Sequence, residues 1–171
     1  MVTYATQGGS TASVAEAIGK TLAENGAIVT VLPIKEVNDL SPYQSVVIGS
    51  AIHGGKWMPE ALTFIDQHQA AFLQVPTAIF QVCMMIASAN VSFKKYIPEW
   101  LTEIHNKIQP VKEGTFAGAI LPNHYSKITE KIGLRIFLAA IKLKTSDYRD
   151  WDAIHHWTED LCPLLLHQEG S

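Results

Sequence analysis

Hydroxyl and glycine residues gather in one short segment near the start of the chain. The segment follows an apolar run at residues 1–5, precedes a stretch of helical periodicity, and consists of Thr6, Gln7, Gly8, Gly9, Ser10 and Thr11. A helix N-terminus presents backbone N–H groups without partners and the positive end of the helix dipole, and both favour a phosphate. Glycines let the backbone approach closely, and hydroxyls add donors. We therefore expect a phosphate-binding loop here.

The composition of this loop restricts the kind of phosphate. No lysine or arginine lies within residues 6–11. The segment lacks the GxxxxGK[ST] pattern that binds a triphosphate with magnesium, and it lacks the GxGxxG pattern that binds a pyrophosphate. Uncharged donors fit a single terminal monophosphate better. The alternative is a simple turn that caps the following helix, and the loop alone leaves both open.

Two further segments follow apolar runs of strand length, at residues 46–52 and 77–85. Open α/β sheets bind ligands just beyond the carboxyl ends of their strands, where the strand order reverses. We therefore expect these segments to lie beside the phosphate loop and to border a ligand. Their candidate residues are Ser50, Ala51, Ile52, His53, Gly54, Gly55 and Lys56 in the first segment, and Cys83, Met84, Met85, Ile86 and Ala87 in the second.

The elements that must position these loops alternate between strand and helix. Apolar runs of strand length occur at residues 1–5, 27–32, 46–52, 77–85 and 115–121. Periodic segments at 11–25, 60–72, 92–108 and from about residue 150 predict the intervening helices. This alternation predicts an α/β fold, a doubly wound five-stranded parallel sheet with helices on both faces. No linker composition interrupts it, so one domain over residues 1–171 is expected.

Composition and charge exclude several classes of function. The formal net charge is −3, which does not suggest a nucleic-acid partner, and no run of about 18 apolar residues suggests a membrane span. Cys83 and Cys162 form no CxxC pair, and no metal-ligand spacing is present. No serine–histidine–aspartate or paired-carboxylate arrangement stands out, so no catalytic acid, base or nucleophile is assigned. A cytoplasmic protein is expected.

The first loop resembles that of the flavodoxin family. Its signature is a strand ending in an aromatic residue, followed by a threonine, a glycine and a second threonine at fixed spacing, and Tyr4, Thr6, Gly9 and Thr11 stand at those positions. The resemblance implies a flavodoxin-like fold in which residues 6–11 hold the phosphate of FMN. It also implies that residues 50–56 and 83–87 border the flavin ring on its two sides.

Three other segments resemble one branch of this family, the menaquinone-dependent protoporphyrinogen IX dehydrogenases. The segments read VVIGSAIHGGKW, IFQVCMMIA and TSDYRDWDAI. The resemblance implies an FMN-dependent oxidoreductase that takes electrons from a small-molecule substrate, such as a porphyrinogen, and passes them to a quinone. A flavodoxin-type electron carrier between redox partners is the alternative. Such carriers usually have a strongly acidic docking face, which a net charge of −3 disfavours.

A basic and apolar helix is predicted at residues 127–142. Six basic residues against two acidic ones lie between residues 126 and 149. At about 100° per residue, four cations of the predicted helix share one stripe beside abundant apolar surface: Lys127, Lys131, Arg135 and Lys142. Such a helix suits peripheral contact with an anionic membrane at the inner face of the cell, where a quinone would be met. A core helix, or a helix buried in a homodimer, remains an alternative.

Overall fold

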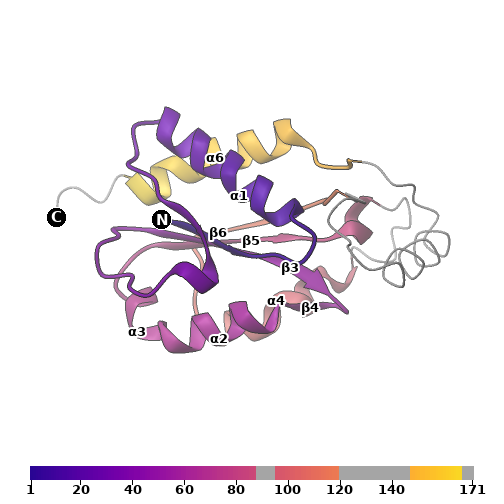
Figure 1. Cartoon of the computed structure of the whole chain (residues 1–171), viewed down its shortest axis with the longest axis horizontal. Coiled ribbons are helices and arrows are strands. Elements are labelled where there is room, and N and C mark those ends of the chain that lie inside the picture. The colour runs from indigo at the N-terminus through magenta and orange to yellow at the C-terminus, as the bar shows by residue number, and fades with distance from the viewer. Residues whose placement is uncertain (88–94, 120–146, 167–171) are drawn as a thin grey trace.

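A parallel sheet with helices on both faces makes up the part of the chain that the computed structural model describes, residues 1–87, 95–119 and 147–166 (Figure 1). In chain order, its elements are β1 (Val2–Ala5), α1 (Ser10–Glu24), β2 (Val31–Pro33), η1 (Ile34–Glu36), β3 (Val46–His53), β4 (Lys56–Trp57), α2 (Pro59–Gln67), α3 (Gln69–Phe72), β5 (Thr77–Val82), η2 (Met84–Ala87), α4 (Ile97–His105), β6 (Lys112–Phe116) and α6 (Trp151–Leu166). The basic helix predicted at residues 127–142 lies outside the described residues.

The strand order confirms the predicted doubly wound sheet. The order is β2-β1-β3-β5-β6 with every neighbouring pair parallel, and the short β4 pairs antiparallel with β3. The chain passes from β1 outward to β2 and then back across β1 to β3, so the strand order reverses beside β1. A ligand site is expected at this switch point, beyond the carboxyl ends of β1 and β3.

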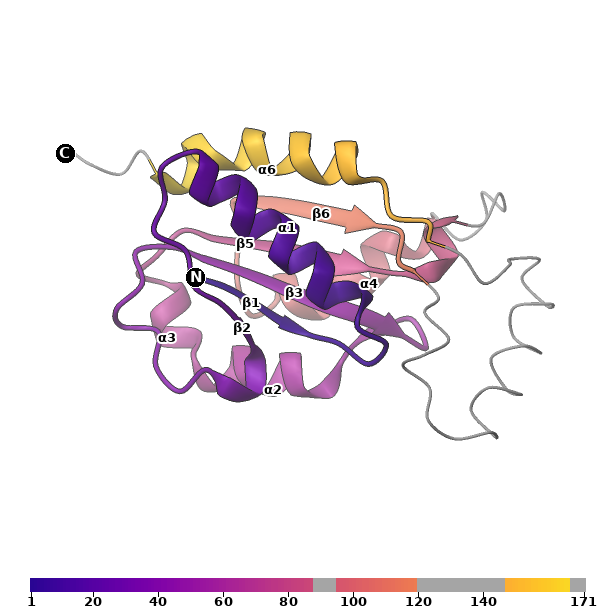
Figure 2. The ribbon, with the colours of Figure 1, turned by 45° about the horizontal axis from the view of Figure 1, so that its top comes forward.

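Two helical layers bury the sheet. Helices α1 and α6 lie against one face, and α2, α3 and α4 lie against the other (Figures 1 and 2). The central strands are mostly apolar because both of their faces are covered, and every residue of β5 is buried, including the polar Thr77 and Gln81. Ile18 and Leu161 belong to the core cluster on the first face, whereas Ile65 and Ile104 belong to the cluster on the second. This core fixes the carboxyl edge of the sheet on which the site lies.

Several element boundaries differ from the sequence predictions. Strand β2 covers only Val31–Pro33, not residues 27–32, because Ala27 and Val29 pack against the core without joining the sheet and Ile28 is fully exposed. The predicted helix at residues 60–72 is divided at His68 into α2 and α3. The last strand covers Lys112–Phe116 instead of residues 115–121, β5 ends at Val82 instead of residue 85, and α4 ends at His105 instead of residue 108. Among the described helices, none is long and apolar enough to cross a membrane.

Candidate functional site

The loop between β1 and α1 is held in shape by a threonine and a glycine. The hydroxyl oxygen Oγ1 of Thr6 accepts a hydrogen bond from the backbone N–H of Gly9 at 3.1 Å. Gly9 has a φ of +81° and is the N-cap of α1, a left-handed conformation that costs an L-residue about 1 kcal/mol or more. Thr6 and Gly9 therefore set the direction in which the first turn of α1 faces.

The first turn of α1 has polar groups in need of a partner. No side chain caps this helix, and its first turn contains no acidic residue. The first hydrogen bond along the helix joins the N–H of Ser13 to the carbonyl of Gly9, so the N–H groups of Ser10, Thr11 and Ala12 have no acceptor within the helix. The hydroxyl of Thr11 is fully buried and has no partner among the residues that the structure describes. This set of donors fits a phosphate group.

A cation reaches the same helix from the far end of the chain. The Nη1 atom of Arg149 donates a hydrogen bond to the Oγ atom of Ser13 at 2.6 Å. Its Nε and Nη2 atoms bind the two carboxylate oxygens of Asp147, at 2.8 and 2.5 Å, and its guanidinium stacks over the ring of Trp151. These hydrogen bonds lower the pKa of Asp147, which therefore stays ionised near neutral pH. Sequence reasoning treated Arg149 only as part of a basic region.

The loop after β3 is a hairpin with a two-glycine turn. Gly54 and Gly55 have φ values of +59° and +78°, as the two central residues of a type I′ turn require, and His53 pairs with Lys56 across it. Ser50 is fully buried, and its hydroxyl accepts a hydrogen bond from the N–H of Met58 at 2.9 Å. Ser50 therefore braces the base of the hairpin, while the side chains of His53 and Lys56 are exposed near its tip.

A buried glutamine, which the sequence analysis did not select, ties this hairpin to the sheet. Gln81 on β5 is fully buried, and its Oε1 accepts a hydrogen bond from the indole N–H of Trp57 at 3.2 Å. Its Nε2 donates to the hydroxyl of Thr115 on β6 at 3.0 Å. These two hydrogen bonds link β4, β5 and β6 through the side chain of Gln81 and hold the β3–β4 hairpin in place.

The third predicted segment, residues 83–87, lies near the predicted phosphate loop. Cys83 is buried at the end of β5, and burial raises the pKa of its thiol, which is therefore neutral near pH 7. Met84–Ala87 forms the half-buried 3-10 helix η2. A Cβ atom on Gly118 would lie 3.1 Å from both the sulfur of Met84 and the hydroxyl oxygen of Ser10, so these two side chains flank the same glycine. The structure thus brings the first and third predicted segments together.

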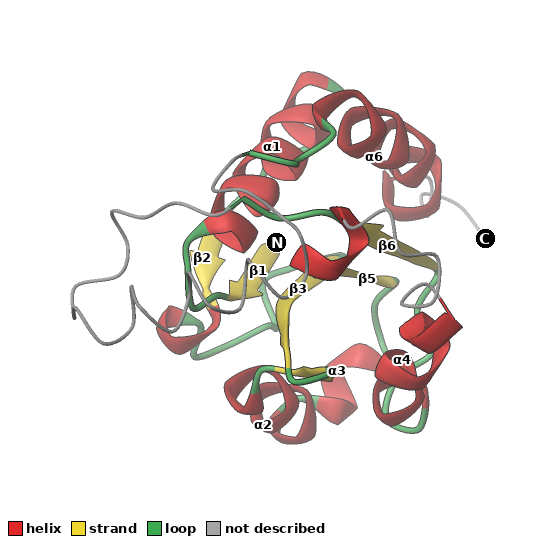
Figure 3. Cartoon of the chain, turned by 90° about the vertical axis from the view of Figure 1, so that its right-hand side faces the viewer, coloured by secondary structure: helices red, strands yellow, loops and turns green. Residues whose placement is uncertain are grey.

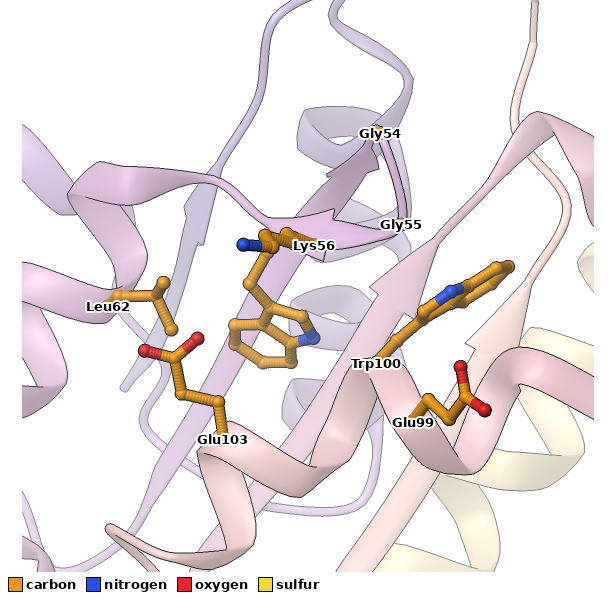
Figure 4. Close-up of a pocket in the computed structure, with 8 residues that line it drawn as sticks. Gly54, Gly55, Lys56, Leu62, Glu99, Trp100 and Glu103 are labelled. Atoms are coloured by element: carbon orange, nitrogen blue, oxygen red, sulfur yellow. The ribbon is translucent and has the colours of Figure 1, made fainter.

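Two cavities lie beside these loops. The larger, about 350 Å³, opens between the β3–β4 hairpin, Leu62 of α2 and the α4 side chains Glu99, Trp100 and Glu103 (Figure 4). The smaller, about 250 Å³, is lined by Tyr4 and Ala5 at the end of β1, by Thr6 just beyond it, by residues 33–35 and by Glu60. Burial, with help from nearby glutamates, raises the pKa of Tyr4, whose phenol is neutral.

The carboxyl edge of the sheet therefore collects most of the predicted site residues (Figure 3). Residues 6–11 form the turn and first helical turn, and residues 83–87 lie next to them. Residues 50–53 end β3, and residues 54–56 extend the hairpin beyond it. Contact of each of these residues with a ligand stays a prediction.

Comparison with known proteins identifies a family and a fold for this chain. A family profile described as a flavodoxin domain matches residues 1–147. A short-chain flavodoxin associated with a non-canonical PDU bacterial microcompartment superposes with a TM-score of 0.60 at 14% identity, and the match covers 94% of this chain and 93% of that one. The Streptococcus pneumonia TIGR4 flavodoxin gives a TM-score of 0.58 at 14% identity over 94% of each chain. A flavodoxin from the domain Archaea gives 0.54 at 16% identity, also over 94% of each chain.

These identities are low enough that the structural likeness shows the fold alone. No curated protein sequence matches the chain significantly.

Proposed function

The chain belongs to the flavodoxin domain family, with FMN as its cofactor, and on this premise we propose that it is an FMN-dependent oxidoreductase acting between a small-molecule donor and a quinone. The resemblance of three segments to menaquinone-dependent protoporphyrinogen IX dehydrogenases supports a porphyrinogen as the donor. The coarser conclusion, a flavin-binding redox protein, rests on the family match over residues 1–147.

The phosphate of FMN fits the first turn of α1. The unpaired N–H groups of residues 10–12 and the buried hydroxyl of Thr11 supply the donors, and Gly9 lets the turn form without a Cβ clash. When bound there, FMN supplies a ring that accepts and releases electrons. The residues of the chain bind and orient it: Thr6 fixes the loop, and Gln81 fixes the hairpin through Trp57.

The charge at the carboxyl edge is the observation that favours an enzyme over a carrier. Lys56 is exposed on the hairpin and lines the larger cavity together with Glu99 and Glu103, Arg149 lies beside α1, and Lys35 lines the smaller cavity with Glu60. A carrier that docks on basic redox partners needs an acidic face, and this mixture of charges does not provide one. An exposed cation beside the ring loop instead suits a substrate with carboxylates, such as a porphyrinogen.

The proposal is tested with FMN-loaded protein, protoporphyrinogen and a water-soluble naphthoquinone under anaerobic conditions. We expect porphyrin fluorescence to rise in proportion to protein and quinone. Lys56→Glu should raise the KM for the porphyrinogen and leave kcat nearly unchanged, because Lys56 acts on the charge of the substrate. Lys20→Glu is the matched control, since Lys20 is an exposed lysine on α1.

Absence of quinone-dependent porphyrin formation would overturn the enzyme assignment. If the same protein then transfers electrons between a flavoprotein reductase and a haem protein, the carrier function is correct. Equal effects of Lys56→Glu and Lys20→Glu would contradict the role of the hairpin in substrate binding.

A further inference from the structure

The side chain of Arg149 lies against α1, the helix whose first turn is proposed to bind the phosphate, and it is largely buried. Only 10% of its side-chain surface is exposed. Three of its five N–H donors are used, two by Asp147 and one by Ser13. Ser13 in turn lies within hydrogen-bond distance of the carbonyl of Gly9, at 3.2 Å. The guanidinium is thus connected through one side chain to the N-cap of α1.

The direction of this ion pair is fixed by its geometry. Asp147 binds the edge of the guanidinium formed by Nε and Nη2, whereas Ser13 binds Nη1 on the other side. The positive end of the pair therefore faces α1, and the negative end faces away from it. A second contact holds this arrangement, because the guanidinium lies 4.5 Å above the ring of Trp151. The pair adds positive potential where the helix dipole is also positive.

The segment that carries Arg149 is itself held at this edge of the sheet. Asp147 forms an antiparallel bridge with Ala119, and the N–H of Tyr148 donates to the carbonyl of Gly118 at 3.2 Å. Gly118 lies beside Ser10, so this short pairing sets the segment next to the start of α1. Arg149 therefore reaches Ser13 from an anchored backbone, although 136 positions separate the two residues.

We propose that Arg149, oriented by Asp147 and Ser13, stabilises the doubly charged phosphate of the flavin and so makes this site select a phosphorylated flavin over riboflavin. The proposal rests on the proposed FMN site. The donors of the loop are all uncharged, and the buried hydroxyl of Thr11 independently marks the place where an acceptor is missing. Arg149 adds a positive charge, which residues 6–11 do not contain. It acts as a positioning and electrostatic residue, and it takes no part in electron transfer.

The test compares FMN and riboflavin affinities by quenching of flavin fluorescence. Arg149→Gln should weaken FMN binding roughly tenfold, a value between those expected for opposite charges in bulk water and near a protein surface, and should leave riboflavin binding unchanged. Arg149→Lys should restore FMN affinity to within about threefold of the starting protein, because it keeps the charge. The FMN affinity of the starting protein should also fall more steeply with salt than that of Arg149→Gln.

Lys112→Gln is the matched control. Lys112 also pairs with an aspartate, Asp160, at 3.0 Å, and it lies at the amino end of β6, at the opposite edge of the sheet. The substitution makes the same change in net charge and should leave the ratio of FMN to riboflavin affinity unaltered.

The results distinguish an interaction of Arg149 with the phosphate from a structural or net-charge effect. Equal weakening of FMN and riboflavin by Arg149→Gln, or the same loss in Lys112→Gln, would overturn the proposal in favour of a structural or a net-charge effect. Unchanged FMN affinity in Arg149→Gln would overturn it as well. If the starting protein itself binds FMN no better than riboflavin, the phosphate site fails, and with it the premise on which Arg149 was assigned.

Discussion

Removing the buried hydroxyl of Thr11 should stabilise the flavin-free protein and at the same time weaken its binding of FMN. Its Oγ1 atom has no partner among the described residues, and the residue is fully buried at the second position of α1. In the protein without flavin, Thr11→Val removes an unpaired polar atom and keeps the shape of the side chain. In the protein with FMN, the same substitution removes a hydrogen bond to a charged phosphate.

The two magnitudes can be estimated separately. A buried hydroxyl without a partner costs about 1 to 3 kcal/mol, so Thr11→Val should raise the free energy of unfolding of the flavin-free protein by about 1 kcal/mol. For a domain of this size, that corresponds to a rise in Tm of about 2 to 4 °C. A hydrogen bond to a charged group is worth about 1.5 to 3 kcal/mol, so FMN binding should weaken by roughly 10- to 150-fold.

Thr3 offers a matched control. Its hydroxyl is also fully buried and lacks a described partner, but it lies within β1. Side chains alternate along a strand, and Met1 and Ala5 belong to the core cluster on the face opposite α1, so Thr3 points to that face too. Thr3→Val should therefore raise the Tm by a similar amount and leave the FMN affinity unchanged.

Thermal unfolding of the flavin-free variants and fluorescence titration with FMN provide the two measurements. A loss of FMN affinity in Thr3→Val equal to that in Thr11→Val would refute the reasoning, as would unchanged FMN affinity in Thr11→Val. A fall in the Tm of flavin-free Thr11→Val would show that its hydroxyl is already satisfied.

Three further predictions concern the residues that shape the site. Gly54→Val should lower the free energy of unfolding by about 1 to 2 kcal/mol because φ is +59° there, whereas Gly54→Asn should be tolerated; equal urea midpoints for the two variants would contradict the type I′ turn. Gln81→Leu leaves the indole N–H of Trp57 unpaired and should lower the free energy of unfolding by about 1 to 3 kcal/mol, and an unchanged urea midpoint would show that this bond is dispensable. The pKa of Asp147 is lowered in the folded state by Arg149, so its stabilisation is present above about pH 4 and is lost as the pH falls through the folded pKa. Asp147→Asn should therefore show a smaller drop in Tm between pH 6 and pH 3 than the starting protein, and identical drops would argue against the ion pair.

The sequence predicted those features of the fold that depend on neighbouring residues. The turn between β1 and α1 was predictable because its hydroxyls and glycines stand together between an apolar strand and an amphipathic helix, whereas its contact with a phosphate stays a prediction. The central strands were predictable because burial on both faces favours largely apolar runs, such as Val46–Ile48 in β3 and Ala78–Phe80 in β5. Gly54 and Gly55 were expected to border a ligand, and the structure adds a local reason for both, a two-residue turn.

The features that the sequence did not predict depend on contacts between distant segments. Gln81 is one polar residue in an apolar strand, and its role appears only when Trp57 and Thr115 lie on either side of it. The position of Arg149 beside Ser13 depends on the pairing of residues 147–148 with 118–119. The edge strand β2 was predicted too long because Ala27 and Val29 are apolar but pack against the core without joining the sheet. Four expectations from the sequence stay predictions. They are membrane contact through residues 127–142, a homodimer, a cytoplasmic location and a single domain over residues 1–171.

The central claim is that the carboxyl edge of this sheet holds FMN by its terminal phosphate. The most direct measurement is to incubate the flavin-free protein with equal amounts of FMN, FAD and riboflavin, remove unbound flavin by gel filtration, and identify what is released by acid. We predict one FMN for each chain, with little FAD or riboflavin. Protein that emerges colourless, or that retains riboflavin as well as it retains FMN, would contradict the claim.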